Sequence, residues 1–489
     1  MSTKTVKIDI LAHADFSGKL RKTKRTPGHA VFGAAVERIR RENPEGTLLL
    51  DAGDEFSTNF WGGAPMVGAV SRIGTDAMTL GNHEFDRGRD FLNDCIAAAD
   101  FPILCANITE RNTGKGIPGT RPWVILEKQG VRIGILGLTT AYTPYMVTAA
   151  AFAPYEAHAC AAAACKYVPE LRAAGAEIVV VLAHIPFYVD KDGGLSGELI
   201  DLLREIPAVD VCIGGHIPGD YAGFFGSTLV LKGGFGGASL CHAALEFDPE
   251  GRSLTKCSGR VLLTDWDAAP VPALLAYADR ITGPFEDFFE KPLADTDEAW
   301  FIRLSAETRL CNYLAQCVQE GAEADFAYLN ATSASGSIMP GSVTAQDIIA
   351  VMGFNDPVMK TQMTGRQIGE LFELVYVPER FGNNAGLMYS GVIVYADHTK
   401  PAFHKIQKIT LRDGTPMDPD HLYTVASSEY MASGGNDTAQ VAGKLQWQKT
   451  GKRMHDLIFA SLEKYGCMKV SDEQRMHEIG RPENDNAPF

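Results

Sequence analysis

The sequence lacks features that mark several other classes of protein. None of its ten cysteines forms a Cys-x-x-Cys pair, so a zinc site of that kind is excluded, and several cysteines lie in apolar stretches as small core residues. No uninterrupted apolar stretch has the roughly 20 residues of a membrane-spanning helix, and the first ten residues contain no apolar signal region. We therefore expect a cytoplasmic protein with reduced cysteines that does not bind membranes.

Positive charge is also scarce. The chain has 45 Lys and Arg residues against 60 Asp and Glu residues, which gives a formal net charge of −15. This charge favours solubility and opposes binding to a nucleic-acid polymer. It does not exclude a small anionic substrate, because a bound metal ion supplies local positive charge.

The length and the pattern of the chain predict more than one domain. At 489 residues the chain is too long for a single hydrophobic core. Strands alternate with helices as far as residue 262 or so. The pattern predicts a helix over 30–41, a buried strand over 131–138 and an alanine-rich helix over 149–174 that leads into a strand over 177–182. Such alternation predicts a layered α/β domain.

Four segments carry polar side chains directly after apolar runs. One run ends abruptly in Asp-Ala-Gly-Asp54, and Gly81-Asn-His-Glu-Phe-Asp follows downstream. We expect the first run to be a buried strand that delivers a carboxylate to the edge of a sheet, and Gly81 to let the backbone turn tightly. Two further apolar runs end in His184 and His216. Asp, Asn and His supply the oxygen and nitrogen ligands of a hydrolytic divalent metal ion.

Each segment also has a simpler interpretation. A single Asp or His after a strand is usually a turn former or a satisfied core residue. The Asn-His-Glu segment that begins at Asn82 is compatible with a helix N-cap followed by an acidic first turn. The occurrence of all four segments in this order favours a common metal site.

Together these segments resemble the calcineurin-like metallophosphoesterases, and specifically their branch of 5'-nucleotidases and 2',3'-cyclic phosphodiesterases. The resemblance implies an α/β fold: a four-layer αββα metallophosphoesterase sandwich followed by a second, α+β nucleotidase C-terminal domain. The corresponding boundaries are residues 1–262 for the first domain, 263–295 for a linker helix, 296–470 for the C-terminal substrate-binding domain and 471–489 for a polar tail.

The resemblance also implies a ligand set for the metal ions. One ion is held in the family by a bridging Asp, an Asn, a strand-end His and the first His of a Gly-His-x-His pair. The matching positions here carry Asp54, Asn82, His184 and His216. We therefore expect one tightly bound divalent ion, Zn, Mn or Mg, at these residues.

The second ion of the family has lost ligands in this chain. It uses the bridging Asp, both residues of an Asp-x-His motif and the second His of the pair. Asp15 matches, but Ser17 and Pro218 stand where the family has histidines. Proline has no side-chain donor atom, and the remaining oxygen ligands favour Mg, Mn or Ca held loosely. We expect this second ion to be weakly bound or absent.

Two other histidines lie near this position in the sequence. His13 shares strand parity with Asp15, and His29 opens a predicted helix in the same region. Neither occupies the position of a family ligand. We therefore expect that neither contacts metal.

The predicted chemistry is hydrolysis of a phosphoric ester. A two-metal site generates a hydroxide at neutral pH and clamps the attacking and leaving oxygens during displacement at phosphorus. By resemblance, His83 contacts the scissile phosphate or the leaving group and is oriented by Asp86. With only one tight ion, the expected turnover is slower.

The C-terminal domain resembles the family in three segments, 326–330, 352–356 and 423–435. In the family two aromatic rings stack on the nucleoside base, and the matching positions here are Phe354 and Tyr430. The predicted substrate-binding residues are Phe354, Asp356, Tyr430 and Asn436. The simpler interpretation of such aromatics is a lid on the core.

The substrate loops depart from the family pattern. The family sequence Asn-Gly-Gly-x-x-Arg is replaced by residues 330–335, which contain no arginine, and Asn436 replaces an aspartate after the Gly-Gly turn. Loss of a guanidinium removes a strong contact to carboxylate or phosphate. We therefore expect a small phosphate ester of nucleotide type with an altered preference.

Two functions follow from these motifs. The first is a metal-dependent hydrolase of phosphoric esters, similar to a 5'-nucleotidase or a cyclic-nucleotide phosphodiesterase, with an altered metal site and substrate pocket. The alternative is a catalytically weak or inactive homologue that binds a nucleotide-like ligand. The presence of His83 and Asp86 favours the enzyme, and the replacements at Ser17 and Pro218 favour the binding protein.

Overall fold

The computed structural model describes residues 5–56, 61–303, 306–375 and 386–480. They divide into two compact units, with the boundary after Pro284. This boundary falls inside the predicted linker 263–295, which is shared between the units: α8 (Pro272–Thr282) packs against α1 (Gly28–Glu42) in the first unit, and α9 (Glu286–Glu290) packs in the second. Among the described residues, no helix is long and apolar enough to cross a membrane.

The described part of the first unit contains two six-stranded mixed sheets. The first sheet has the order β16 (Ser253–Leu263), β15 (Ser239–Asp248), β1 (Val6–His13), β2 (Thr47–Asp51), β3 (Ala77–Thr79) and β4 (Ile103–Leu104). The second has the order β13 (Tyr221–Phe225), β14 (Thr228–Lys232), β12 (Val211–Gly214), β9 (Ile178–His184), β7 (Val131–Thr139) and β6 (Trp123–Lys128).

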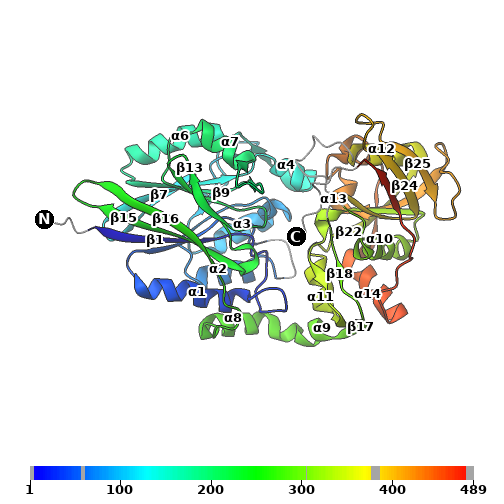
Figure 1. Cartoon of the computed structure of the whole chain (residues 1–489), viewed down its shortest axis with the longest axis horizontal. Helices are drawn as coiled ribbons and strands as arrows, with labels where there is room; N and C mark the ends of the chain where they lie inside the picture. Colours follow the sequence, from blue (N-terminus) through cyan, green and yellow to red (C-terminus); the bar gives the residue numbers. More distant parts are fainter. Residues whose placement is uncertain (1–4, 57–60, 304–305, 376–385, 481–489) are drawn as a thin grey trace. The chain divides into compact units, whose positions relative to one another are not determined.

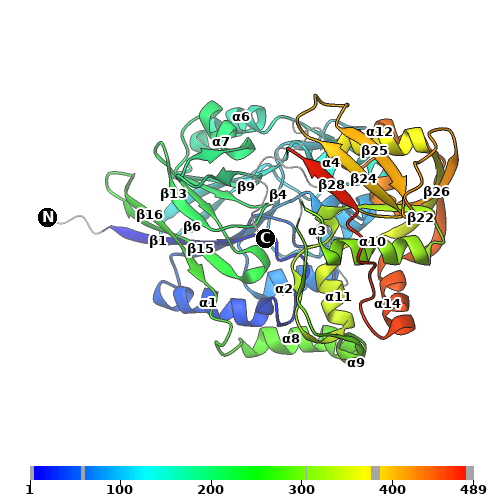
Figure 2. The same ribbon diagram turned by 45° about the vertical axis from the view of Figure 1, so that its right-hand side comes forward.

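The two sheets face each other and helices cover their outer faces. Buried side chains of both sheets, among them Leu48, Leu50 and Val180, form one core between the sheets. Figures 1 and 2 show α1, α2 (Ala64–Arg72), α3 (Gly88–Ala98) and α8 along the first sheet and α6 (Cys160–Ala173) and α7 (Glu198–Glu205) along the second. Because these strands are covered on both faces, their apolar runs are continuous rather than alternating. The predicted four-layer αββα sandwich is confirmed.

The prediction of one helix over 149–174 is wrong. The segment forms α5 (Ala149–Phe152), then β8 (Tyr155–Ala157), and only then α6. Pro154 cannot continue the hydrogen bonding of a helix, and the chain turns there so that β8 pairs with β5 (Ile108–Glu110). Helix propensity of the alanines did not decide the structure at this point.

The second unit contains a five-stranded and a three-stranded sheet in its described part. The first has the order β23 (Leu387–Ser390), β19 (Phe326–Asn330), β26 (Leu422–Ser428), β22 (Pro357–Thr364) and β27 (Gln448–Arg453), and the second has the order β25 (Ile406–Leu411), β24 (Val392–Asp397) and β28 (Met476–Ile479). The helices include α10 (Arg309–Gly321), α11 (Ala345–Val351), α12 (Gly365–Val375), α13 (Glu429–Ala432) and α14 (Met454–Tyr465).

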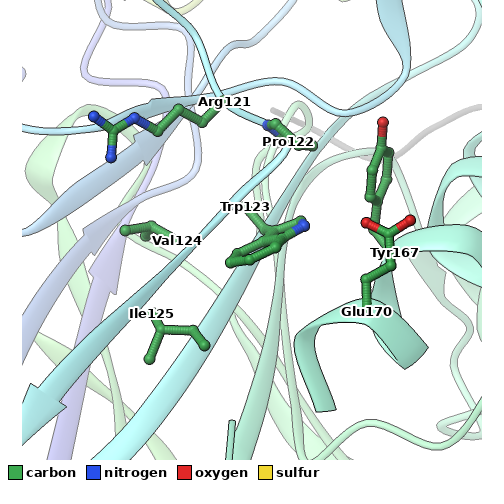
Figure 3. Close-up of a pocket in the computed structure, with 7 residues that line it drawn as sticks. All are labelled: Arg121, Pro122, Trp123, Val124, Ile125, Tyr167 and Glu170. Carbon is green, nitrogen blue, oxygen red and sulfur yellow. The ribbon is translucent and has the colours of Figure 1, made fainter. Parts of the chain in front are cut away.

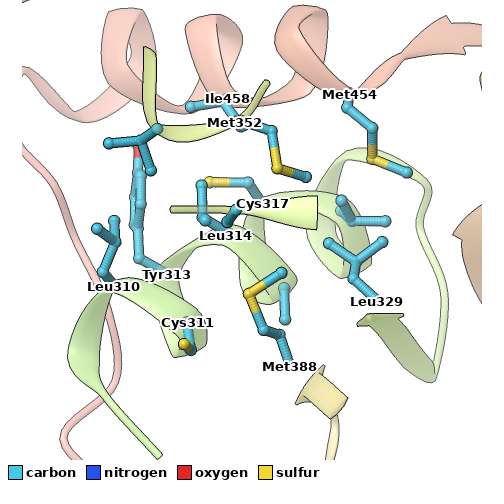
Figure 4. Close-up of a cluster of buried hydrophobic side chains, with 14 of the residues drawn as sticks. Leu310, Cys311, Tyr313, Leu314, Cys317, Leu329, Met352, Met388, Met454 and Ile458 are labelled. Carbon is cyan, nitrogen blue, oxygen red and sulfur yellow. The ribbon is translucent and has the colours of Figure 1, made fainter. Parts of the chain in front are cut away.

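The main core of this unit lies between α10, α14 and the five-stranded sheet. Figure 4 shows Leu314 of α10 and Ile458 of α14 among the side chains of this cluster, together with the methionines Met352 and Met388. A second cluster packs α12 against the other face of the same strands. The predicted α+β C-terminal domain is thus present as an independently packed unit.

The prediction of a polar tail over 471–489 is wrong for its first part. Met476–Ile479 forms β28, which pairs in parallel with β24. Arg475 is 1% exposed, and its guanidinium donates hydrogen bonds to the carbonyl oxygens of Asn312 and Tyr389. A buried arginine is tolerated when its donors are paired, so polar composition did not indicate an exposed segment. Residues 481–489 of the predicted tail lie outside the described residues.

We expect the substitution Arg475→Ala to destabilise the second unit by about 3 kcal/mol, because carbonyl and side-chain acceptors around the guanidinium lose their donors while remaining buried. Thermal and urea unfolding of the full chain will measure the effect. The control is Arg366→Ala, since Arg366 forms an exposed ion pair with Asp420 and should change the free energy of unfolding by less than about 1 kcal/mol. Equal effects of the two substitutions would contradict a structural role for Arg475.

Candidate metal centre

Four predicted ligands converge where strands of both sheets end. Asp54 and Asn82 follow the parallel strands β2 and β3, and His184 and His216 end or follow the parallel strands β9 and β12. The Nε2 atom of His184 lies 3.0 Å from Oδ2 of Asp54. The Nδ1 atom of His216 lies 2.8 Å from Oδ1 of Asn82 and 3.3 Å from Nε2 of His184. The structure thus brings together one carboxylate, one amide and two imidazoles.

This donor set fits a divalent metal ion. Ligands bound tetrahedrally to zinc at its usual bond length are separated by about 3.4 Å, which is close to the 3.3 Å between the ring nitrogens of His184 and His216. The Nδ1 atom of His184 donates to the carbonyl oxygen of Ala52 at 2.7 Å. This bond fixes the orientation of the ring and directs Nε2 toward the other donors. The roles of these residues as metal ligands stay predictions.

The pKa values of the residues in the centre indicate that the site favours one positive charge. Burial would lower the pKa of His184, but the Asp54 carboxylate raises it to about 9. Burial and the charge of His184 lower the pKa of His216 to about 3. Burial would raise the pKa of Asp54, yet the neighbouring histidines hold it below its ordinary value. A cation bound among these donors would take the place of this proton.

Several site residues have an unusual backbone conformation. Asp15, Asp54 and His216 have positive φ angles of 60°, 63° and 77°, which are uncommon for residues other than glycine and cluster at functional sites. The predicted tight turn at Gly81 does not involve a positive φ angle. A Cβ atom at Gly81 would lie 2.1 Å from Oδ1 of Asp54, so glycine is required for space.

Glu84 organises the centre and was not predicted to do so. Its buried carboxylate accepts four backbone N–H groups at 2.7 to 2.9 Å, those of Asp54, Glu55, Phe56 and Gly81. It therefore joins the loop after β2 to the loop after β3. The glutamate within Asn-His-Glu, followed by an apolar residue, is the available signal in the sequence, but the sequence alone favours an acidic first turn at this place.

The helix N-cap interpretation of Asn82 is correct in position but not in the role of the side chain. Asn82 precedes the 3₁₀ helix η1 (His83–Phe85), but its side chain makes no capping hydrogen bond. The amide oxygen instead lies 2.8 Å from the ring of His216. The side chain thus contributes to the convergent donor set rather than to the helix.

His83 and Asp86 form a pair beside the centre. The Nδ1 atom of His83 lies 2.8 Å from Oδ2 of Asp86, and its Nε2 atom lies 3.9 Å from Oδ2 of Asp54. Burial would lower the pKa of His83, but the carboxylates of Asp86 and Asp54 raise it to about 10. These carboxylates therefore favour the protonated form of the ring, which Asp86 orients and which is partly exposed.

Two residues at the predicted second metal position, Asp15 and Ser17, form hydrogen bonds with the backbone of the centre. Oδ2 of Asp15 accepts the backbone N–H of His216 at 3.0 Å, and burial raises the pKa of Asp15 to about 7. The hydroxyl of Ser17 donates to the carbonyl oxygen of Asp54 at 3.2 Å. Pro218 is exposed. Asp15 thus supports the loop that carries His216.

The predicted substrate residues lie at one end of a strand pair in the second unit. Phe354 and Asp356 precede β22, and Tyr430 lies in α13 directly after β26, which pairs with β22 so that Val358 faces Ser428. The hydroxyl of Tyr430 donates to Oδ1 of Asn436 at 3.1 Å and accepts its backbone N–H at 3.2 Å. The Tyr430 ring covers Gly435, where a Cβ atom would lie 2.4 Å from a ring carbon. Substrate binding at these residues stays a prediction.

A surface pocket of about 530 Å³ lies elsewhere in the first unit. Figure 3 shows Trp123 of β6 facing Tyr167 and Glu170 of α6 around it. None of its lining residues belongs to the predicted site, and it offers one carboxylate against an apolar wall. The pocket does not bear on the metal centre.

We expect the substitution Gly81→Ala to reduce metal content and metal-dependent activity by at least tenfold, because the methyl group would displace the Asp54 carboxylate. Metal analysis and circular dichroism of the purified variant will separate loss of metal from loss of fold. The control is Gly116→Ala, since a Cβ atom at Gly116 meets nothing within 4 Å. Full metal content in Gly81→Ala would show that Asp54 is not a ligand.

The sequence is similar to that of known proteins over nearly its whole length. Residues 294–443 match the family model of the 5'-nucleotidase C-terminal domain. The chain is 24% identical to Protein UshA of Yersinia enterocolitica over 532 residues, which covers 97% of this chain and 94% of the relative.

Two solved structures extend the likeness to the fold. The 5'-nucleotidase precursor of Thermus thermophilus superposes with a TM-score of 0.84 at 22% identity, covering 98% of this chain and 100% of that one. The calcineurin-like phosphoesterase YfkN of Bacillus subtilis superposes with a TM-score of 0.52 at 21% identity, covering 59% of this chain and 100% of that one. Residues 294–443 therefore match the 5'-nucleotidase C-terminal domain, the chain is similar along nearly its whole length to relatives of that kind, and its two-domain fold is that of a solved 5'-nucleotidase precursor.

Proposed function

We propose that this protein is a metal-dependent phosphoesterase that hydrolyses a nucleotide, a cyclic nucleotide or a closely related small phosphate ester. The convergence of four side chains carries the proposal: contacts of 2.8 to 3.3 Å link Asp54 to His184, His184 to His216, and His216 to Asn82. The relatives named 5'-nucleotidase support the substrate class. The ten free cysteines favour a reducing compartment, and we propose the cytoplasm.

The residues of the centre have different catalytic roles. A divalent ion, when bound, supplies an acidified water and polarises a phosphoryl oxygen. Asp54, Asn82, His184 and His216 would hold it. The carboxylate of Glu84 keeps the loops that carry Asp54 and Asn82 in fixed positions, so that the donors need no rearrangement when charge develops on the phosphoryl group.

His83 supplies the positive charge and the proton of the site. Its ring is held by Asp86 through the 2.8 Å contact at Nδ1, so its Nε2–H is the group that would donate to a phosphoryl oxygen or to the leaving oxygen. A protonated imidazole at this place stabilises charge in the transition state and can donate a proton to the departing alkoxide. Asp86 acts through His83 by fixing its orientation.

The second position of the centre is proposed to bind metal weakly. Only Asp15 and Asp54 remain there as protein ligands, with Ser17 and Pro218 in place of nitrogen donors. Fewer ligands leave more coordination positions to water and lower the affinity. Turnover is then slower than with two tightly held ions, because one of the two clamps on the reacting oxygens is often missing.

The alternative function is a homologue that binds a nucleotide-like ligand through Phe354 and Tyr430 without efficient hydrolysis. A panel of 5'-mononucleotides, 2',3'-cyclic nucleotides and an aryl phosphate, each with Mn, Mg, Co or Zn, will decide between the functions. Metal-dependent release of phosphate supports the hydrolase. If calorimetry shows that a nucleotide binds but no metal supports its hydrolysis, the protein is a binding protein and the hydrolase proposal is wrong.

We expect His83→Asn to lower kcat by about 10² to 10⁴ with little change in metal content, because the substitution removes the proton donor but no predicted ligand. Steady-state kinetics with the best substrate of the panel and metal analysis will measure both effects. The matched control is His158→Asn, since His158 is exposed in the same unit. An unchanged kcat in the His83→Asn variant would show that His83 has no catalytic role.

We expect Ser17→His combined with Pro218→His to add one equivalent of tightly held metal and to raise the rate on an aryl phosphate, which does not need the altered substrate loops. Each single substitution should have little effect, because a site that lacks one ligand still binds loosely, so the effects should not be additive. No gain in metal or rate in the double variant would mean that the backbone at these positions does not present ligands to the second position.

A further inference from the structure

A second group of ionisable side chains is buried beneath helix α1. It consists of His13 at the end of β1, Asp51 at the end of β2 and Glu55 in the following loop, and all three are 0% exposed. His13 and Asp51 are neighbours in the parallel register of β1 and β2. The Nδ1 atom of His13 lies 3.4 Å from Oε1 of Glu55, and its Nε2 atom lies 4.0 Å from Oδ2 of Asp51. One nitrogen and one oxygen of each carboxylate lie within 4.8 Å of one another.

The polar atoms of this group are only partly used. Oδ1 of Asp51 accepts the backbone N–H of Gly53 at 2.9 Å, and Oε1 of Glu55 accepts that of Phe16 at 3.2 Å. Both ring nitrogens of His13, Oδ2 of Asp51 and Oε2 of Glu55 are buried and have no hydrogen-bond partner among the described residues. Each such unsatisfied atom is costly. Hydrogen bonds from the backbone therefore orient both carboxylates. At least one nitrogen or oxygen atom of each of the three side chains remains available to bind a ligand.

The surroundings exclude water and are aromatic. The ring of Phe16 lies 5.7 Å and that of Phe32 5.1 Å from the ring of His13, both in edge-to-face geometry. The ring of His29 packs against Phe16 at 4.0 Å, and its two nitrogens are also buried without a hydrogen-bond partner in the described part of the chain. Burial raises the pKa of both carboxyl groups, so their ionised forms require a compensating positive charge.

We propose that His13, Asp51 and Glu55 bind a divalent transition-metal ion at a site separate from the strand-edge centre. Two carboxylates and one dication give a neutral group, which removes the charge imbalance of the buried site. One imidazole and two carboxylates suit zinc or manganese, whereas calcium requires six or more oxygen ligands. This ion would make His13 a metal ligand, against the expectation drawn from its sequence position.

The proposed ion would stabilise the loops that carry residues of the strand-edge centre. Glu55 is adjacent to Asp54, and Phe16 is adjacent to Asp15. Cross-linking the ends of β1 and β2 through metal would hold both loops in the conformations with positive φ that Asp15 and Asp54 adopt. The proposal does not depend on the chemistry performed at the strand-edge centre.

Metal analysis of full-length variants tests the site. The background is His184→Ala with His216→Ala, which removes two ligands of the strand-edge centre. After dialysis and reloading with Zn²⁺, this protein should retain one equivalent, and adding Glu55→Gln or His13→Phe should remove it. The matched control is Glu110→Gln, which alters another buried carboxylate of the first unit and should leave the count unchanged.

A second measurement covers the case in which the added substitutions prevent folding. X-ray absorption at the zinc edge of the background variant should show one histidine nitrogen and otherwise oxygen ligands, and Zn²⁺ should raise its unfolding temperature. No bound equivalent in the background variant, or an equivalent that persists with Glu55→Gln and His13→Phe, would overturn the proposal. The three side chains would then form a proton-sharing neutral cluster.

Discussion

The candidate centre depends on the hydrogen bonds that one buried carboxylate accepts. Glu84 receives four backbone N–H groups from the loops after β2 and β3, and so holds two separate chain segments at a fixed distance. Because Gly81 has no side chain, the two loops can approach closely enough for these bonds to form. The positions of Asp54 and Asn82 follow from this contact, and the ligands from the second sheet meet them there.

Charge is the second constraint on this part of the molecule. The ends of the central strands bring carboxylates and imidazoles into surroundings that exclude water, where an unbalanced charge is costly. At the strand-edge centre, a proton on His184 balances Asp54 when no metal is bound. Beneath α1, the carboxylates of Asp51 and Glu55 share the single imidazole of His13. A cation bound at either group would balance these charges.

The departures from the family pattern at Ser17 and Pro218 do not affect the fold, because neither residue belongs to a hydrophobic core of the first unit. Pro218 is exposed, and Ser17 binds a backbone carbonyl that any hydroxyl or water can reach. The layers are held by apolar side chains on both faces of the strands. A chain can therefore keep the 5'-nucleotidase fold while its metal and substrate positions change, since function depends on side chains placed on the fold rather than on the fold itself.

The sequence by itself determined the continuous apolar strands, the layered α/β class and the polar side chains at the strand ends, because the burial of both sheet faces and the abrupt end of an apolar run are local signals. It did not determine the pairing of β8 with β5, the paired strand that begins at Met476 or the partners of His13. Those features depend on segments distant in the chain. Glu84 is a further example. The sequence shows a glutamate at this position, but its four backbone donors come together only when the loops after β2 and β3 meet. Tertiary packing therefore decides the role of this residue.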